Sequence, residues 1–194
     1  MTYDITQTDL NTGNLVNHFL ISMPGLSDPN FSHSITYICE HSSEGAMGLV
    51  VNHGLSIHFD EVLEQMGIED RANVGSKEVL AGGPVQVGRG FVLHSNDRCW
   101  SSTLKVTDDI FLTASKDIIE AIAVDDGPES SLVILGYAGW EAGQLEREIA
   151  ENAWLTVPAD SRVLFGTDTT QRWQAAADHM GVDLNLISSC AGHA

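Results

Sequence analysis

The best candidate for a catalytic or metal-binding group in this sequence is the tripeptide Cys39-Glu40-His41. Side chains alternate between the two faces of a strand, so Cys39 and His41 share one face if this segment is extended. The pair is then half of a metal site, a thiolate beside an imidazole, or a small buried thiol next to a hydrogen-bonded ring. A metal ion needs two further ligands from elsewhere, so we favour the structural interpretation and expect no metal and no cofactor.

Cys99 is the second candidate thiol. It lies between Arg98 and Trp100, and a neighbouring cation favours the reactive thiolate. A loop at this position would expose it. We interpret Cys99 as inert, and we keep one alternative open: a redox sensor or enzyme that uses Cys39 or Cys99 with a nearby histidine.

Residues 81–90, AGGPVQVGRG, are rich in glycine. They lack the Gly-Lys-Ser/Thr of a phosphate-binding loop, and they precede an apolar strand, whereas a dinucleotide fingerprint opens a helix. Two interpretations remain. The glycines shape the backbone, with Gly82 and Gly83 in a turn and Gly88 and Gly90 allowing a bend or a close approach. Alternatively, backbone amides form a nest for an anion beside Arg89.

The segment 136–155, GYAGWEAGQLEREIAENAWL, is the most distinctive stretch of the chain. It continues an apolar strand and passes into a helix near Gly143. Trp140 and Trp154 stand at the two ends of this helix, where they can fix it to the sheet. The apolar helical positions are Leu145, Ile149 and Ala153, and the neighbouring wetter face carries Glu141, Gln144, Glu148 and Glu151. Such an acidic face beside a tryptophan can bind a cationic partner, although a solvated surface is the simpler explanation.

The pattern of apolar residues predicts an α+β fold. Strands are predicted over residues 15–23, 35–39, 46–51, 91–93, 102–106, 131–137 and 162–165. Helices are predicted over 59–66 with Gly67 as the terminator, over 115–123, and from Asp168, where Gln171 completes a capping box. The alternation is irregular, so we expect a mixed, largely antiparallel sheet in one domain over 14–194, behind a loosely ordered segment 1–13.

The charge of the chain restricts the kinds of partner that it can bind. Nine Lys and Arg residues against 27 Asp and Glu residues give a net charge of −18. Proteins that grip DNA neutralise phosphates with clustered cations, so we expect no direct nucleic-acid binding. We see no signal peptide and no apolar run long enough to span a membrane, and the three cysteines lie far apart. These features predict a cytoplasmic protein.

Several stretches occur together in an order that resembles one protein family. They are MPGLSDPNF at 23–31, CEHSSEGAMGLVVN at 39–52, GGPVQVGRGFVLHS at 82–95, the long segment 121–160, and AGHA at 191–194. The chain resembles the YqgE/AlgH family of bacterial proteins. The resemblance implies a bifurcated sheet with a small barrel-like part, surrounded by helices. The family has no established biochemical activity, and some members carry a transcriptional-regulator label through a link to exopolysaccharide control.

From the residues and the resemblance together, we expect a non-enzymatic binding or regulatory protein that acts through a protein or small-molecule partner. An indirect role in transcription is a further alternative, because we find no helix-turn-helix signature. The fold is expected to bring several motifs into one binding surface. The candidate residues of that surface are Asp28, Asn30, Glu44, Gly82, Gly83, Arg89, His94, Trp140 and Gln144.

Overall fold

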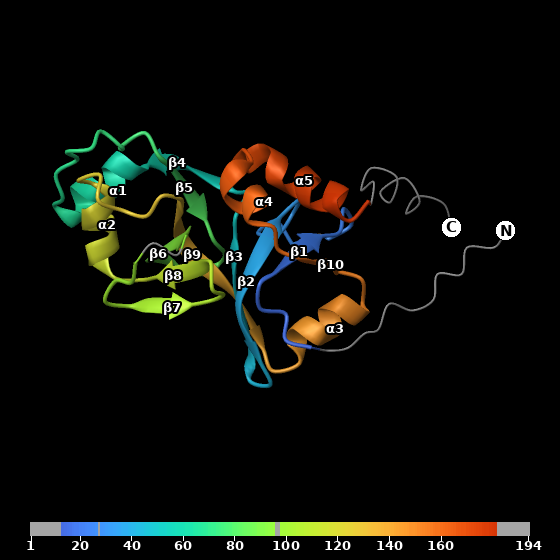
Figure 1. Ribbon diagram of the computed structural model, residues 1–194. Coiled ribbons are helices and arrows are strands. Elements are labelled where there is room, and N and C mark those ends of the chain that lie inside the picture. Colours follow the sequence, from blue (N-terminus) through green and yellow to red (C-terminus); the bar gives the residue numbers. More distant parts are fainter. Residues whose placement is uncertain (1–12, 27, 96–97, 182–194) are drawn as a thin grey trace.

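The computed structural model describes residues 13–26, 28–95 and 98–181 of the chain, and its ten strands form one branched sheet (Figure 1). The main path runs β10-β1-β2-β3-β9-β6-β8-β7. Its strands are β1 (His18–Ser22), β2 (Ile35–Ser42), β3 (Gly45–Val50), β6 (Val85–Ser95), β7 (Thr103–Lys105), β8 (Ile110–Thr113), β9 (Ser131–Glu141) and β10 (Trp154–Pro158). A side branch holds β4 (Gly54–His58) and β5 (Glu78–Ala81), and only β5 and β9 run parallel. The predicted mixed, largely antiparallel α+β fold is confirmed.

The sheet divides along β9. The C-terminal part of β9 pairs with β3, and its N-terminal part pairs with β5 on one side and β6 on the other. From β6 the sheet curls through β8 to β7 and forms a half-barrel (Figure 1). The fork therefore separates a part built on β1, β2, β3 and β10 from a part built on β4 to β8.

Glycines make the fork possible. Gly136 has a φ of +74°, and a Cβ there would lie 2.7 Å from the Gly83 carbonyl oxygen. A Cβ at Gly83 would lie 2.4 Å from the Tyr137 carbonyl, and one at Gly82 would lie 2.3 Å from the Gly136 carbonyl oxygen. No side chain fits in such contacts, so Gly82 and Gly83 do shape the backbone, but through close approach to β9 and not through the turn that the sequence predicted.

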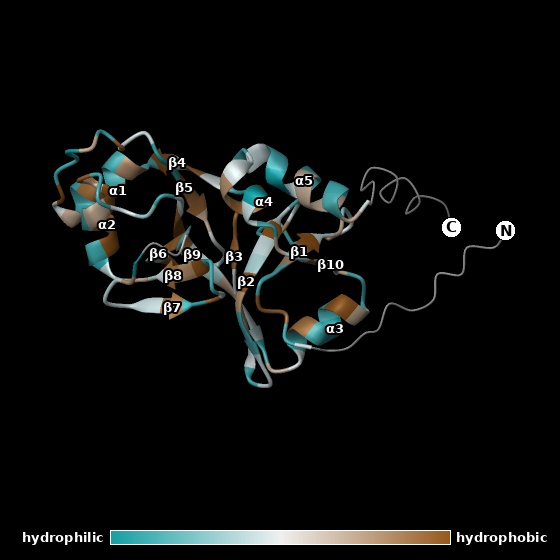
Figure 2. Cartoon of the chain, in the orientation of Figure 1, coloured by the Kyte–Doolittle hydropathy of each residue, from teal (hydrophilic) through white to brown (hydrophobic). Residues whose placement is uncertain are grey.

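Three apolar clusters hold the helices against the sheet. Figure 2 shows the hydrophobic positions along the strands and helices. The helices are α1 (Phe59–Met66), α2 (Lys116–Ile122), α3 (Gln144–Ala150), α4 (Ser161–Gly166), the 3-10 turn η1 (Thr169–Gln171) and α5 (Arg172–His179). α4 and α5 pack on β1 and β2, α1 and α2 pack on β6 and β9, and α3 packs beside Trp140 and Trp154. Each helix thus buries one apolar face, which is the main source of stability for helices this short.

The C-terminal part of the fold corrects two predictions. The expected strand at 162–165 is wrong, because these residues form α4. Asp160 accepts a hydrogen bond from the backbone N–H of Arg162 and caps this helix, while Val163 and Leu164 enter the core. The next helix does not start at Asp168 as expected: the chain first makes the η1 turn, in which the Asp168 carbonyl accepts from Gln171 N–H, and α5 begins at Arg172.

Other predictions are confirmed or fall outside the structure. The helix at 59–66 ends as predicted, with Gly67 in the left-handed conformation at φ +67°. The segment 1–13, expected to be loosely ordered, lies outside the described residues except for Gly13, and so does AGHA at 191–194. Among the described helices, none is long and apolar enough to cross a membrane.

Candidate functional site

Two adjoining hollows lie between the β2–β3 hairpin and the half-barrel, and they share Glu40 and Met47. The first, of about 600 Å³, is lined by Val16, Cys39, Glu40, His41, Ser42, Glu44, Gly45, Ala46, Met47, Lys105 and Trp140. The second, of about 560 Å³, is lined by Glu40, Met47, Arg89, Phe91, Ser101, Ser102, Thr103, Leu104, Leu112, Ala114 and Tyr137. We call the two together the hairpin hollow.

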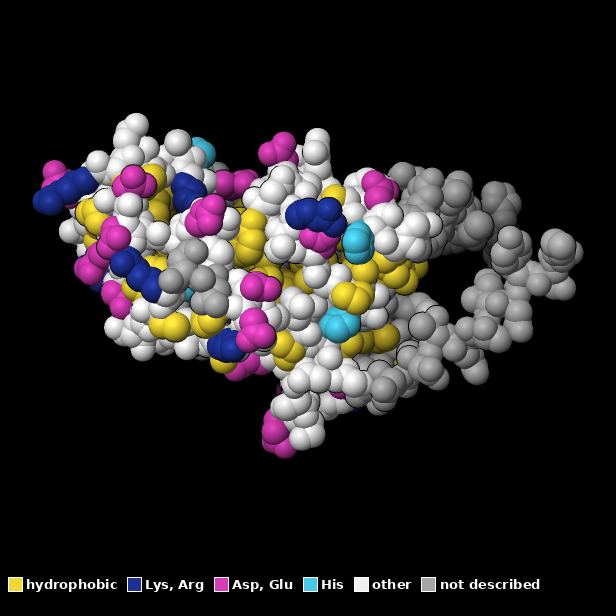
Figure 3. Space-filling view, viewed as in Figure 1, with side chains coloured by type: hydrophobic (Ala, Val, Ile, Leu, Met, Phe, Trp, Pro, Cys, Tyr) yellow, Lys and Arg dark blue, Asp and Glu magenta, His cyan; other side chains and the backbone are white. Residues whose placement is uncertain are grey.

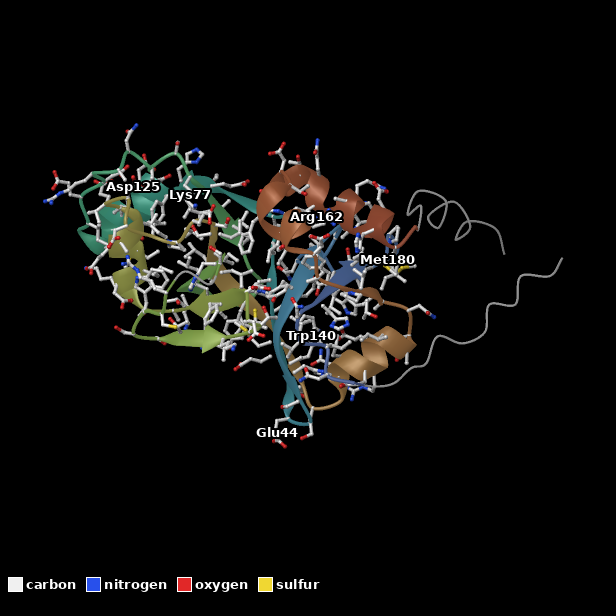
Figure 4. The ribbon with its side chains drawn as sticks, in the orientation of Figure 1. Glu44, Lys77, Asp125, Trp140, Arg162 and Met180 are labelled. Carbon is white, nitrogen blue, oxygen red and sulfur yellow. The ribbon has the colours of Figure 1, made fainter. Side chains whose placement is uncertain are left out.

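The hairpin is positioned by a tight turn and by contact with β9. Ser43 and Glu44 connect β2 to β3, and the Ser42 hydroxyl accepts a hydrogen bond from the Glu44 N–H at 3.2 Å. A Cβ at Gly45 would lie 2.2 Å from the Trp140 carbonyl oxygen, so only glycine lets the two strands approach this closely. Figure 4 shows Glu44 at the tip of the hairpin and Trp140 further up, towards the middle of the molecule.

His41 links three parts of the chain at one wall of the hollow. Its Nδ1 lies 3.0 Å from the backbone nitrogen of Leu15 and accepts that N–H, so the ring proton is on Nε2. Nε2 donates to the Glu146 Oε1 of α3 at 2.8 Å. The pKa of the Glu146 carboxyl is held below its ordinary value by a hydrogen bond to its own backbone N–H, together with His41. Both nitrogens of the imidazole therefore have structural partners.

Cys39 is a buried thiol. Its side chain is 2% exposed, and its sulfur lies 3.8 Å from the Tyr37 carbonyl oxygen, to which it donates. Burial raises the pKa of this thiol, and the nearby Glu40 raises it further. A reactive thiolate–imidazole pair needs an ionised sulfur and a free imidazole nitrogen. Neither condition is met at Cys39 and His41, which instead form part of the wall.

Charges of both signs surround an apolar floor. Met47, Phe91 and Tyr137 form much of that floor, with the two rings in edge contact at 6.0 Å. Figure 3 shows acidic side chains spread over the visible face and hydrophobic ones exposed along the furrow between the two parts of the molecule. Exposed Glu40 and Glu44 stand on the hairpin side.

The cations at the opposite rim already have contacts. Lys105 Nζ lies 2.6 Å from Asp108 Oδ1, so its charge is shared with a carboxylate. The Arg89 guanidinium lies 5.1 Å from the centre of the Phe91 ring, and it donates to Gln86 Oε1 at 3.3 Å. Both side chains are exposed and can still turn toward a ligand.

The structure brings some of the sequence-predicted site residues together and separates others. Glu44, Arg89 and Trp140 line the hairpin hollow together with Cys39 and His41. Gly82 and Gly83 lie at the fork, where backbone surrounds them. Asp28 and Asn30 lie in an exposed turn before β2, where the Asp28 carboxylate accepts from the backbone and side-chain N–H groups of Asn30.

His94 does not belong to a binding surface, because it is 0% exposed. Its Nδ1 donates to the Ser95 carbonyl at 2.8 Å, so Nε2 accepts the Thr113 hydroxyl, also at 2.8 Å. The ring packs against Trp100 and Phe111. Residues 91–94 of β6 are all buried, so both faces of the strand are covered here, and nothing in the residue type of His94 indicates this.

Gln144 and Glu148 are fixed within the molecule. Gln144 accepts from the Glu141 N–H at 3.0 Å and donates to Glu148 Oε1 at 2.9 Å. Glu148, expected on a wetter face, is half-buried, and it also accepts the indole N–H groups of Trp140 and Trp154. Two buried indole donors require an acceptor, and this requirement is a signal that sequence reasoning missed.

Cys99 is exposed beside a cation that has its own partner. Arg98 Nη2 lies 2.8 Å from Asp126 Oδ2, and its guanidinium lies 5.2 Å from the centre of the Trp100 ring.

Within residues 13–26, 28–95 and 98–181, no group of three or more His, Cys, Asp or Glu side chains is placed to hold a metal ion.

Comparison with known proteins identifies the family. A family model described as AlgH-like matches residues 19–185. The chain belongs to the AlgH-like family. Among AlgH-like relatives, it is 57% identical over 183 residues to a UPF0301 protein of Thioalkalivibrio sulfidiphilus, covering 94% of this chain and 98% of the relative. It is 53% identical over 180 residues to a UPF0301 protein of Saccharophagus degradans, covering 93% and 89%.

Solved structures agree with the AlgH-like fold. The solution structure of AlgH from Pseudomonas aeruginosa has a TM-score of 0.77 at 44% identity and covers 97% of this chain and 100% of that one. A crystal structure of a Corynebacterium diphtheriae protein has a TM-score of 0.70 at 15% identity, covering 88% and 89%, and this likeness shows the fold alone. The names of these relatives state no activity, so a functional proposal for this AlgH-like chain rests on the geometry of its site.

Proposed function

We propose that this AlgH-like chain is a non-enzymatic binding or regulatory protein, and that its hairpin hollow receives an extended segment of a partner protein. The observation that carries the proposal is the edge of β7. In the part of the chain that the structure describes, this strand ends the path of the sheet and pairs only with β8, while Ser101 to Lys105 line the hollow. An unpaired strand edge is a template for another strand.

The hydrogen-bond pattern indicates which backbone groups are available. The Ser102 carbonyl accepts from Ala114 N–H, and Val106 N–H donates to the Ile110 carbonyl, both at 3.0 Å. Directions alternate along a strand, so the N–H and C=O groups of Thr103 and Lys105 point away from β8. An added strand would pair with these two residues and lie over the hollow.

The side chains around the hollow favour a particular kind of segment. An apolar side chain would reach the floor at Met47 and Tyr137, and a basic one would meet Glu40 or Glu44 on the rim. The net charge of −18 favours the approach of a basic segment over long distances. The same charge opposes contact with phosphates, so we propose that the chain does not bind nucleic acid directly.

The thiol-based alternative has less support. Cys39 is buried, with its sulfur bonded to a carbonyl and its pKa raised by burial, and His41 has both nitrogens in use. Cys99 is exposed, but the cation beside it pairs with Asp126. Binding therefore accounts for the hollow better than nucleophilic or redox chemistry does.

The proposal is tested by selecting peptides from a random displayed library with the purified full chain. We expect the selected peptides to alternate apolar with Lys or Arg residues. Lys105→Pro removes one N–H at the free edge of β7 and should weaken their binding at least tenfold, since proline is tolerated at a strand edge but cannot donate. Lys105→Gln is the matched control, because it removes the same charge and keeps the N–H. Equal binding by both variants, or no enrichment of peptides, contradicts the proposal.

A further inference from the structure

A third cavity, which shares only two lining residues with the hairpin hollow, lies between α1, α2 and the sheet. Its volume is about 390 Å³. Val62 and Met66 of α1, Ile119 of α2, and Val133 and Leu135 of β9 line it, and Phe91 and Ala114 border both this cavity and the hollow. Binding pockets for small molecules have volumes of roughly 300–1,000 Å³ and mostly apolar walls. This cavity has those properties.

Two glycines of β6 keep the cavity open. Gly88 and Gly90 both line it, and neither is among the described glycines with positive φ. A Cβ at Gly88 would meet no atom within 4 Å, and one at Gly90 would meet only Leu135 Cδ2 at 3.8 Å. The predicted close approach at these two glycines is therefore wrong, and neither it nor a positive φ requires glycine here, in contrast to Gly83 and Gly136. The predicted bend agrees with the irregular pairing of β6 with β9 between Val85 and Gly90. Glycine inside a strand weakens it and often marks the place where a ligand approaches.

We propose that this cavity binds a small aliphatic carboxylate. The aliphatic chain would lie against Val62, Ile119 and Leu135. Among the lining residues, Lys116 is the one charged side chain, and Gln65 and Ser115 add polar groups. These residues provide one cationic end to a mostly apolar space, which matches a molecule with one anionic head and an apolar body.

Lys116 is available to such a head group. Its Nζ lies 3.3 Å from Glu120 Oε1, and the two side chains are 51% and 53% exposed. Exposed ion pairs one helical turn apart are weak, so a ligand carboxylate can replace Glu120. At roughly 30 Å³ for each water-sized group, the cavity has room for about a dozen non-hydrogen atoms, which accommodates octanoate.

Titration of the full chain with octanoate, 1-octanol and octylammonium, followed by amide chemical shifts, tests this proposal. We expect saturable binding of octanoate with a Kd on the order of 100 µM and shifts around β6 and α2. Octanoate should bind at least fivefold more tightly than octylammonium. No saturable octanoate binding up to roughly ten times that Kd, or equal binding of octylammonium, overturns the proposal.

Variants separate the ligand site from general effects on folding. Gly90→Val fills the cavity and should weaken octanoate binding at least tenfold, while Gly25→Ala, at an open position elsewhere, should leave it unchanged. If Gly90→Val fails to fold, Gly90→Ala serves, since its Cβ would meet only Leu135 Cδ2, a cavity-lining atom, at 3.8 Å. Lys116→Gln should weaken octanoate binding and leave 1-octanol unaffected. Unchanged octanoate binding in the cavity-filling variants overturns the assignment. Because the peptide test uses the hairpin hollow, the two proposals can fail independently.

Discussion

Trp140 and Trp154 donate their indole N–H groups to the same carboxylate oxygen, Oε2 of Glu148, at 2.9 and 2.8 Å. The two rings meet edge to face with centres 6.1 Å apart, and Phe31 packs against both. One tryptophan belongs to β9 and the other to β10, while Glu148 belongs to α3. This contact fastens α3 to both strands and keeps the Trp140 wall of the hairpin hollow in place.

Replacing Glu148 by Ala should destabilise the protein. The change leaves two indole N–H groups without their acceptor, on side chains that are 6% and 3% exposed, which costs about 1–3 kcal/mol for each such donor. Chemical denaturation followed by tryptophan fluorescence measures the free energy of unfolding. Glu151→Ala, an exposed glutamate at the end of the same helix, is the control and should change stability by less than about 0.5 kcal/mol. If the two changes lower the free energy of unfolding equally, the hydrogen bonds of Glu148 to the two indoles do not contribute to stability.

Gly136→Ala should destabilise the fold by more than about 1 kcal/mol, because alanine is strained at positive φ. Its Cβ would also lie 2.7 Å from the Gly83 carbonyl oxygen. Gly166→Ala is the matched control, since a Cβ there meets nothing within 4 Å. Thermal unfolding of both variants measures the difference, and a Gly136→Ala protein as stable as the control would contradict the proposed origin of the fork.

Asp160 should make stability depend on pH in the acid range. Hydrogen bonds from the Arg162 side chain and from its backbone N–H lower the pKa of this carboxyl to about 2 from the ordinary 3.8. Because this pKa is lower in the folded protein, the Asp160 carboxylate contributes fully to the free energy of unfolding above about pH 4. That contribution is lost as the pH falls toward 2. Asp160→Asn keeps a capping group and loses the charge, so the loss of stability between pH 4 and pH 2 should become smaller. Urea unfolding at several pH values measures this loss. An Asp160→Asn protein that loses as much stability between pH 4 and pH 2 as the unchanged protein would contradict this assignment.

The two described cysteines should differ in reactivity. Cys39 should react with a thiol reagent at pH 7 only when the protein unfolds, because it is 2% exposed and burial raises its pKa. Cys99 is exposed and should react in the folded protein. The rate of labelling is measured on two variants. One keeps Cys39 and has serine at positions 99 and 190, and the other keeps Cys99 and has serine at positions 39 and 190. Rapid labelling of native Cys39 would restore the thiol-based alternative.

Regular periodicity made parts of this fold predictable. The apolar positions of residues 59–66 repeat at helical spacing, and Gly67 supplies the left-handed terminator that the structure contains. The long apolar run after Ser131 predicted the strand on which the sheet divides. Residues 162–165 were mispredicted as a strand, because a short apolar run is compatible with a strand and with a helix. In the structure they form a helix, whose first turn is capped by Asp160.

The hairpin hollow was only partly predictable. Glu44, Arg89 and Trp140 were expected in one surface, whereas Lys105 and Tyr137 enter it because the half-barrel curls back toward the hairpin. Such curvature depends on pairings between segments far apart in the chain, such as β6 with β9. The strands β4 and β5 were not predicted, because they have only five and four residues. The burial of His94 likewise follows from its strand neighbours, and its residue type does not signal it.

Hydrogen exchange at the β7 edge is the most direct test of the central proposal. With a selected peptide bound to the full chain, we expect the amides of Thr103 and Lys105 to exchange at least tenfold more slowly, and the amides of Ser102 and Leu104 to change little. That alternation is specific to a strand added at the free edge. Peptide binding that leaves Thr103 and Lys105 unprotected, or protects only residues outside the hairpin hollow, would contradict the proposal.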